Sequence, residues 1–207
     1  MDKTSKLFDV WAKTGRSEDM EKGHGTTVNQ FLDKLQLQEK FKFLDIGCGN
    51  GWVVRKMSQK LSCIKAIGLD KSKIMIKNAN SKILSEKENY FVTELEKWHT
   101  KEKFDIIFSM ESLYYSVPME PALEKVFQLL KKGGVFYCGT DFYSDNTLTT
   151  RWIKDMNVPM DLRSEKEWKK MFTKAGFTTR SKHVTDPKNK SKWKREFGTL
   201  FVIGRKS

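Results

Sequence analysis

The sequence has few cysteines and no long apolar segment. Its 207 residues include three cysteines and four prolines. No apolar run approaches the ~20 residues that a membrane span requires. The polar start Met1–Lys6 does not resemble a signal peptide, and three cysteines cannot form the even set of a secreted disulfide framework. These absences predict reduced cysteines and a cytoplasmic protein without a membrane span.

Acidic residues are also scarce relative to basic ones, 26 against 39. The excess lies at the end of the chain, where residues 151–207 hold 16 basic and 6 acidic side chains. In Lys188–Arg195, basic residues flank Trp193, a pattern that can bind phosphates and stack a base. A solvated lysine-rich hairpin is the alternative, because specific phosphate recognition favours arginine. No spacing of His, Cys and Asp indicates a metal site.

The most informative motif is Phe43–Gly51, which reads FLDIGCGNG and joins a short apolar run to a glycine-rich turn. Its glycines allow positive φ angles and a close approach of a ligand to the backbone. Asp45 at the junction would repel a pyrophosphate, whereas it would attract a ligand that carries an ammonium and a sulfonium. The spacing also departs from the dinucleotide fingerprint. The motif therefore predicts a site for S-adenosylmethionine.

A second acid follows the next apolar run. Ile64–Leu69 ends at Asp70, nineteen residues after Gly51. A carboxylate at the tip of this strand can accept hydrogen bonds from both hydroxyls of a ribose. The alternative is that Asp70 only caps a helix that begins near Ser72.

With these residues in place, the chain resembles the class I (Rossmann-like) S-adenosylmethionine-dependent methyltransferases, in particular the small single-domain type 11 group. The resemblance continues through Gly68–Ser72, Val92–Leu95, Phe104–Ser109 and Leu130–Phe136. Glu94-Leu95 stands where the family commonly has Asp-Ala. The resemblance implies that the following residues contact the cofactor: Asp45, Gly47, Cys48, Gly49, Gly51, Asp70, Lys71, Met75, Glu94, Leu95 and Met110, with Trp11 and Arg16 from an N-terminal lid.

The alternation of strand and helix patterns, together with this resemblance, predicts an α/β three-layer sandwich. We expect a Rossmann-like, seven-stranded, mostly parallel sheet with an antiparallel last strand. Strands are expected at residues 40–46, 64–69, 90–93, 105–109, 135–140, 177–184 and 199–204, and helices at 27–37, 50–61, 72–84, 121–130 and from a capping box at 164–167 to Gly176. One domain, 1–207, would comprise a helical lid (1–38), a cofactor-binding core (39–141), and a substrate-side insertion with the C-terminal strands (142–207).

The chemistry demands little of the protein. A sulfonium methyl group is already activated, so the enzyme mainly holds a nucleophile in line and excludes water. A base is needed only for a protonated nucleophile. The candidates for that role are Glu111, Asp141 and His24, the last in an expected loop between two glycines, and the candidates for substrate contact are Tyr114, Tyr115, Tyr143 and Trp152. Each also has a purely structural explanation in packing, turn capping or solvation.

The sequence therefore predicts a methyltransferase that acts on a small-molecule acceptor. One alternative is an RNA or protein methyltransferase that docks its substrate on Lys188–Arg195, and charge reversal of Lys190, Lys192 and Lys194 should then abolish activity. Met110–Tyr115 lacks an Asn-Pro-Pro-Tyr-type motif, which counts against methylation of exocyclic base nitrogens. Another alternative is a protein that binds the cofactor without transferring a methyl group.

Overall fold

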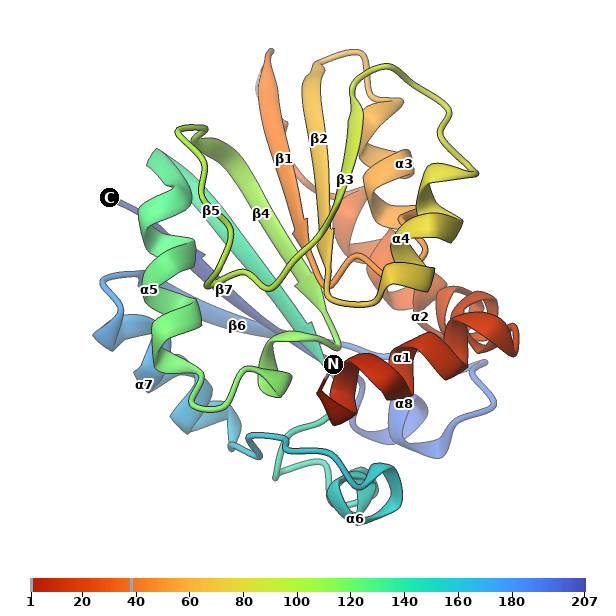
Figure 1. Ribbon diagram of the computed structural model, residues 1–207. Coiled ribbons are helices and arrows are strands. Elements are labelled where there is room, and N and C mark those ends of the chain that lie inside the picture. The colour runs from red at the N-terminus through yellow and green to blue at the C-terminus, as the bar shows by residue number, and fades with distance from the viewer. Residues whose placement is uncertain (1, 38) are drawn as a thin grey trace.

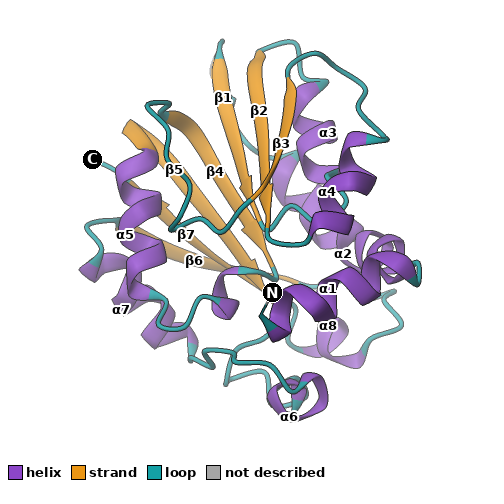
Figure 2. Cartoon of the chain, viewed as in Figure 1, coloured by secondary structure: helices purple, strands orange, loops and turns teal. Residues whose placement is uncertain are grey.

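A central sheet lies between two layers of helices in the computed structural model of the chain, which describes residues 2–37 and 39–207 (Figures 1 and 2). The strands are β1 Phe41–Ile46, β2 Cys63–Asp70, β3 Glu88–Val92, β4 Phe104–Met110, β5 Leu130–Thr140, β6 Thr178–Val184 and β7 Thr199–Arg205. The helices are α1 Lys3–Lys13, α2 Arg16–Leu32, α3 Trp52–Ser58, α4 Lys73–Asn80, α5 Glu120–Leu129, α6 Trp152–Met156, α7 Glu165–Lys174 and α8 Lys192–Glu196, with a 3-10 turn, η1, at Leu113–Tyr115.

The seven strands are ordered β3-β2-β1-β4-β5-β7-β6. Neighbours among β1 to β5 pair in parallel, whereas β7 runs antiparallel to both β5 and β6. The prediction of a mostly parallel sheet with an antiparallel last strand is confirmed. The strand order reverses between β1 and β4, and a crevice for a ligand opens beyond the carboxyl ends of the strands at such a switch point.

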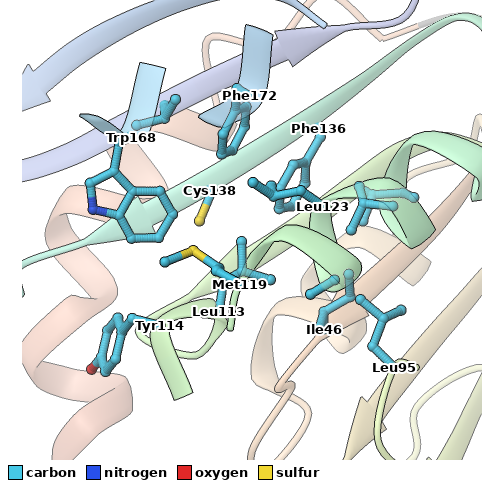
Figure 3. Packing of buried hydrophobic residues seen from close by; sticks show 14 of the residues in the cluster. Ile46, Leu95, Leu113, Tyr114, Met119, Leu123, Phe136, Cys138, Trp168 and Phe172 are labelled. Atoms are coloured by element: carbon cyan, nitrogen blue, oxygen red, sulfur yellow. The ribbon is translucent and has the colours of Figure 1, made fainter. Parts of the chain in front are cut away.

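The two faces of the sheet are buried by different helices, because side chains alternate along each strand. Phe41 and Phe43 of β1 pack in one cluster with apolar side chains of α2, α3 and α4. Leu44 and Ile46 of the same strand join the opposite cluster, which α5 and α7 cover. Figure 3 shows part of this second cluster, in which side chains of α7 lie over β5. Both helix layers are therefore held by apolar contacts.

Helix α2 differs from the prediction. It begins at Arg16 and continues through Gly23, His24 and Gly25, where a loop was expected, and it ends at Leu32 rather than at residue 37. Glycine costs roughly 1 kcal/mol in a helix interior. Tertiary packing outweighs this cost, since the Phe31 ring stacks on Phe201 of β7 with a centroid separation of 4.0 Å. The expected lid boundary at residue 38 lies outside the described residues.

The basic segment before the last strand also differs from the expected hairpin. It contains the short helix α8, and Trp193 packs edge-on against Trp152 with ring centroids 5.5 Å apart. The predicted capping box is confirmed, because Ser164 and Glu167 bond reciprocally at the start of α7. None of the helices in residues 2–37 and 39–207 has the length and hydropathy needed to cross a membrane.

Candidate functional site

A cavity of about 440 Å³ lies at the carboxyl ends of the parallel strands, within the range of about 300–1,000 Å³ that ligand pockets have. Helices α1 and α2 contribute residues to it, and Figure 1 shows α1 at this end of the sheet. The hydrogen bond from Ser72 Oγ to Asp9 Oδ1, 2.5 Å long, ties α1 to the start of α4. Of the predicted cofactor residues, ten line the cavity: Asp45, Gly47, Cys48, Gly49, Asp70, Lys71, Met75, Glu94, Leu95 and Met110.

The glycine turn adopts the backbone geometry that the motif predicts. Gly47, Gly49 and Gly51 have φ angles of 71°, 52° and 80°. A Cβ atom on Gly47 would lie 1.8 Å from Ser112 Oγ, and one on Gly51 would lie 2.6 Å from the Tyr90 ring. Gly51 does not line the cavity. It is the N-cap of α3, where the absence of a side chain leaves room for the Tyr90 ring.

Asp45 is the penultimate residue of β1 and is 2% exposed. It has no hydrogen-bond or ion-pair partner among the described residues. Burial and the nearby Asp70 raise the pKa of its carboxyl group well above the ordinary value. A buried charge without a counter-charge is costly, so this part of the cavity fits a ligand that supplies a cation, as S-adenosylmethionine does with its ammonium and sulfonium groups.

Asp70 ends β2 and holds the glycine turn in place. Its Oδ2 accepts a hydrogen bond from the Gly49 amide at 3.0 Å, and its Oδ1 accepts one from the Ser72 amide at 2.8 Å. Each carboxylate oxygen can accept a second bond, so the group retains capacity for ribose hydroxyls. The N-cap of α4 is Ser72, which accepts from the Met75 amide. Capping of α4 therefore explains only one of the two hydrogen bonds that the Asp70 carboxylate accepts.

The predicted lid residues are not in the cavity lining. The Arg16 guanidinium lies 4.0 Å from the centre of the Trp11 ring, and Trp11 packs on the side of Met75. Helices α1 and α2 instead present Phe8, Met20 and other residues to the cavity. The two N-terminal helices therefore line the cavity with side chains other than the predicted ones.

The three acid-base candidates converge from distant parts of the chain. Asp141, which is fully buried at the end of β5, lies 3.7 Å from His24 Nδ1. The Glu111 carboxylate accepts a hydrogen bond from the Asp141 amide and another from Tyr114 Oη, the latter 2.9 Å long. Glu111 and His24 line the cavity, whereas Asp141 lies behind them. The prediction that His24 sits in a loop was wrong, because α2 carries it into this cluster.

A residue that the sequence analysis misplaced completes the cluster. Lys194, expected on an exposed docking loop, is 3% exposed. Its Nζ lies 2.6 Å from Asp141 Oδ2 and 3.0 Å from His24 Nδ1. The sequence of the lysine-rich segment does not show that Lys194 is buried while its neighbouring lysines are exposed. The burial arises because α8 orients this one side chain toward the interior.

Glu21 was also missed. It lines the cavity, and its Oε2 accepts a hydrogen bond from Asn50 Nδ2 at 2.9 Å. Ser17, Glu21 and His24 recur at helical spacing, a signal that would have been visible if the helix had been extended through the glycines.

The charge states in the cluster follow from burial and from Lys194. Burial and the Lys194 ammonium lower the pKa of His24 to about 4, so the imidazole is neutral at neutral pH. Burial opposes ionisation of Asp141, but the Lys194 ammonium beside it holds the pKa of that carboxyl below its usual range. Burial and the Asp141 charge raise the pKa of Glu111 to about 8. Glu111 also has a φ of 52°, an uncommon value for a non-glycine residue.

Of the predicted substrate-contacting aromatics, Tyr115 lines the cavity. Tyr114 and Tyr143 are buried in the core, and Trp152 stacks on Phe142 outside the lining. Burial raises the pKa of the Cys48 thiol well above its ordinary value, so this cysteine is unsuited to act as a nucleophile. Within the described part of the chain, no group of three His, Cys, Asp or Glu residues is arranged to hold a metal ion.

Comparison with known proteins gives consistent results. The family described as a methyltransferase domain matches residues 17–182. The solved complex between the Trm112 methyltransferase activator of Haloferax volcanii and a methyltransferase contains a chain that is 26% identical, with a TM-score of 0.89 over 96% of both chains. An S-adenosylmethionine-dependent methyltransferase from Mesorhizobium loti shares the fold at 21% identity, with a TM-score of 0.70 over 86% of this chain and 97% of that one.

Curated relatives match over shorter stretches. Malonyl-[acyl-carrier protein] O-methyltransferase 2 of Ilyobacter polytropus is 33% identical over 104 residues, which are 50% of this chain and 40% of that protein. The matches span about half or less of the length of the first curated relatives.

Proposed function

Because the chain belongs to the methyltransferase domain family, we propose that it is an enzyme that transfers a methyl group from S-adenosylmethionine to a small-molecule acceptor. The observation that carries the proposal is the pair of carboxylates, Asp45 and Asp70, that lie at the carboxyl ends of β1 and β2 beside the glycine turn. Asp45 suits the cationic end of the cofactor, and Asp70 suits the ribose.

The bound cofactor supplies a methyl group already activated by its sulfonium sulfur. The protein's contribution is to bind, orient and exclude water. Asp45 and Asp70 hold the donor at the ends of β1 and β2, while Phe8 and Met20 cover the cavity from α1 and α2. Met75, which is 1% exposed in the lining, supplies an apolar surface for the adenine.

Calorimetric titration with S-adenosylmethionine, S-adenosylhomocysteine and NAD tests the donor site. We expect the first two to bind and NAD not to bind. Asp45→Ala and Asp70→Ala should each weaken binding at least about tenfold, because each removes a charge-assisted contact. Asp155→Ala on α6 is the matched control, since Asp155 is half exposed and, among the described residues, pairs with Arg151 alone. Unchanged affinity in both cavity variants would overturn the site assignment.

The acceptor half of the proposal rests on the lining of the site. Residues of α2 and of the segment after β4 line the cavity, and buried side chains such as Met75, Leu95 and Phe108 form part of its wall. The basic segment Lys188–Arg195 contributes none of the lining residues. A small acceptor held inside fits this arrangement better than a polyanion docked on the outer surface.

We also infer that a methyltransferase activator of the Trm112 type binds this chain. The similar methyltransferase was solved in complex with such an activator. Exposed apolar side chains gather at one edge of the sheet. Among the described residues, six of the nine exposed large hydrophobic side chains lie on β3, on the loop before it, or near the start of neighbouring β2: Leu61, Ile64, Ile83, Leu84, Phe91 and Val92. An exposed edge strand can also pair with an added strand.

Gel filtration with a purified Trm112 protein tests this partner. We expect a complex that Phe91→Lys and Val92→Lys weaken at least about tenfold, because they place charges on an apolar contact. Lys182→Glu, on the opposite edge strand β6, is the control. Absence of a complex, or equal loss with the control, would contradict the inference.

A further inference from the structure

The carboxylate of the proposed cofactor needs a hydrogen-bond donor in the cavity. S-adenosylmethionine carries an α-carboxylate next to its ammonium group, and Lys71 is the one lysine or arginine among the described lining residues. Lys71 directly follows Asp70, beside the proposed ribose end, and its Nζ lies 3.5 Å from Asp2 Oδ2. Arg16, which was expected in the cofactor site, stacks on Trp11 instead. The amino-acid end of the cofactor must therefore find another partner.

Three backbone amides of the glycine turn are already used within the protein. The amides of Gly47 and Cys48 both donate to the Leu69 carbonyl, at 2.8 and 2.9 Å. The Gly49 amide donates to Asp70 at 3.0 Å. Each amide has one proton to donate, so these groups are not available to a ligand. A carboxylate beside the turn has to be met by a side-chain donor.

His24 lies beside this turn on the inner face of α2. Glu21, one helical turn before it, accepts a hydrogen bond from the side chain of Asn50 in the turn, at 2.9 Å. Ser17, Glu21 and His24 all line the cavity, so they share the helix face that is directed toward it. The imidazole therefore lies about one helical turn, roughly 5 Å along α2, from a side chain that is bonded to the turn.

A second series of contacts reaches the same region from the end of β5. Asp141 lies 3.7 Å from His24 Nδ1, and the Asp141 amide donates to the Glu111 carboxylate. The next residue, Ser112, lies so close to Gly47 that a Cβ on that glycine would be 1.8 Å from Ser112 Oγ. Gly47 opens the glycine turn. Contacts from both sides of the cavity therefore connect His24 to the turn that would hold the amino-acid end of the cofactor.

The contact with Lys194 fixes the tautomer of His24. A lysine ammonium can only donate hydrogen bonds, and Lys194 Nζ lies 3.0 Å from His24 Nδ1. Nδ1 is then the acceptor, and the proton of the neutral ring is on Nε2. The ring is neutral because burial and the Lys194 charge lower the pKa of His24 to about 4. Nε2 has no hydrogen-bond partner among the described residues, so its N–H is available to a ligand in the cavity that His24 lines.

We propose that His24 donates a hydrogen bond from Nε2 to the α-carboxylate of S-adenosylmethionine and thereby positions the methyl donor. This inference rests on the proposed methyltransferase function. Lys194 bonds to the opposite nitrogen of the ring and so keeps the donor nitrogen directed at the ligand. The Lys194 charge is balanced by Asp141 at 2.6 Å, so the group behind the ring carries no uncompensated charge. With its acceptor nitrogen occupied, His24 is a hydrogen-bond donor and not the base for which it was a candidate.

Calorimetry with a matched pair of ligands tests the contact. S-adenosylhomocysteine carries the carboxylate, whereas its decarboxylated analogue keeps the ammonium group and the adenosine but lacks the carboxylate. In His24→Asn the side chain reaches only as far as Nδ1, so it can still accept from Lys194 but has no donor at the position of Nε2. In His24→Gln the side chain reaches the position of Nε2 and keeps a donor there. His99→Asn, at an exposed site after β3, is the matched control.

His24→Asn should weaken binding of S-adenosylhomocysteine at least about tenfold, because a charge-assisted hydrogen bond is lost. Binding of the decarboxylated analogue should change less than about twofold. The ratio of the two changes is the informative quantity, since this comparison separates the contact from other effects of the substitution. His24→Gln should retain most of the affinity, and His99→Asn should behave as the parent. Equal losses for both ligands, or no loss in His24→Asn, would overturn the assignment.

Nuclear magnetic resonance of the protein with isotope-labelled histidine gives a readout that needs no substitution in the protein observed. The His24 ring, assigned by its absence from the spectrum of His24→Gln, should carry its proton on Nε2 and none on Nδ1. Addition of S-adenosylhomocysteine should shift the Nε2–H resonance more than addition of the decarboxylated analogue. A proton on Nδ1, or equal shifts, would overturn the proposal. If neither ligand nor S-adenosylmethionine binds the parent protein, the methyltransferase function itself is contradicted instead.

Discussion

Asp141 and Lys194 form an ion pair in which both side chains are almost completely buried. Asp141 is held further by the Thr199 hydroxyl, which donates to its Oδ1 at 2.7 Å. Such a pair is costly to desolvate, and the loss of one partner leaves an uncompensated charge in the interior. The pair therefore constrains the residues around the acceptor side of the cavity, including Glu111, which bonds to the Asp141 amide.

Lys194→Gln should lower the free energy of unfolding by about 3–5 kcal/mol, because the Asp141 carboxylate would lose its buried counter-charge. Lys192→Gln is the matched control on the same helix. Lys192 is largely exposed, so its replacement should stay within about 0.5 kcal/mol of the parent. Urea unfolding of both variants measures the difference, and equal stabilities would contradict the buried pair.

His24 should make the folded protein sensitive to acid. Its pKa falls from 6.5 to about 4 on folding, so the folded form binds fewer protons than the unfolded chain between these pH values. The stabilisation is present above pH 6.5 and is lost as pH falls towards 4. The loss is on the order of 3 kcal/mol. Thermal unfolding from pH 8 to pH 4 should show a shallower decline in His24→Gln, with His99→Gln behaving as the parent.

The two carboxylates that we propose for the donor could be predicted from sequence because each lies at the end of a strand. Asp45 and Asp70 come after apolar runs, and parallel strands bring their carboxyl ends to one edge of the sheet. Glu21 and Lys194 could not be predicted in the same way. Their positions depend on how α2 and α8 are rotated against the sheet, which tertiary packing decides.

At the scale of elements, the strands could be predicted from the sequence more closely than helix α2. Six of the seven strands begin within two residues of their predicted positions, and β5 begins at Leu130 instead of residue 135. Long apolar runs identify buried strands well. The predicted helix began too late, at residue 27, because two glycines precede it. In the structure α2 begins at Arg16 and continues through both glycines, because its later residues are held by buried contacts.

The glycines of α2 and of the cofactor turn should respond oppositely to substitution. A Cβ atom on Gly23 would have no neighbour within 4 Å, and one on Gly25 would reach only Asn29 at 4.0 Å. Gly23→Ala and Gly25→Ala should each stabilise the protein by about 0.5–1 kcal/mol by reducing the freedom of the unfolded chain. Thermal unfolding measures this gain. Gly47→Ala should instead destabilise the turn and weaken cofactor binding, and a gain in stability there would contradict the geometry.

On the scale of the whole molecule, positive and negative charge are separated. The chain has a formal net charge of +13, while the charged side chains that line its cavity are six carboxylic groups and one lysine. The outer basic side chains Lys188, Lys190 and Lys192 are exposed, whereas Lys194 is not. Charge reversal of Lys190, Lys192 and Lys194 would therefore disturb the core as well as the surface. Loss of activity in that variant would not distinguish a polyanionic acceptor from a small one.

The triple variant Lys188→Glu, Lys190→Glu and Lys192→Glu makes the distinction cleanly. With a small acceptor bound in the cavity, kcat/KM should change less than about twofold, because exposed charges at a distance are screened by salt. The assay is methyl transfer at physiological salt. Loss of most activity, with cofactor affinity retained, would favour a polyanionic acceptor docked on this surface.

The contact between His24 and Lys194 joins residues 170 positions apart in the chain, and this separation has a consequence for how the protein is made. The turn, Asp45 and Asp70 all lie within the first 70 residues, so the strands that carry the donor site leave the ribosome early. Asp141 follows much later, and its counter-charge later still. The two carboxylates proposed to hold the donor therefore leave the ribosome long before Asp141 and Lys194, and the parts of the site emerge in a fixed order.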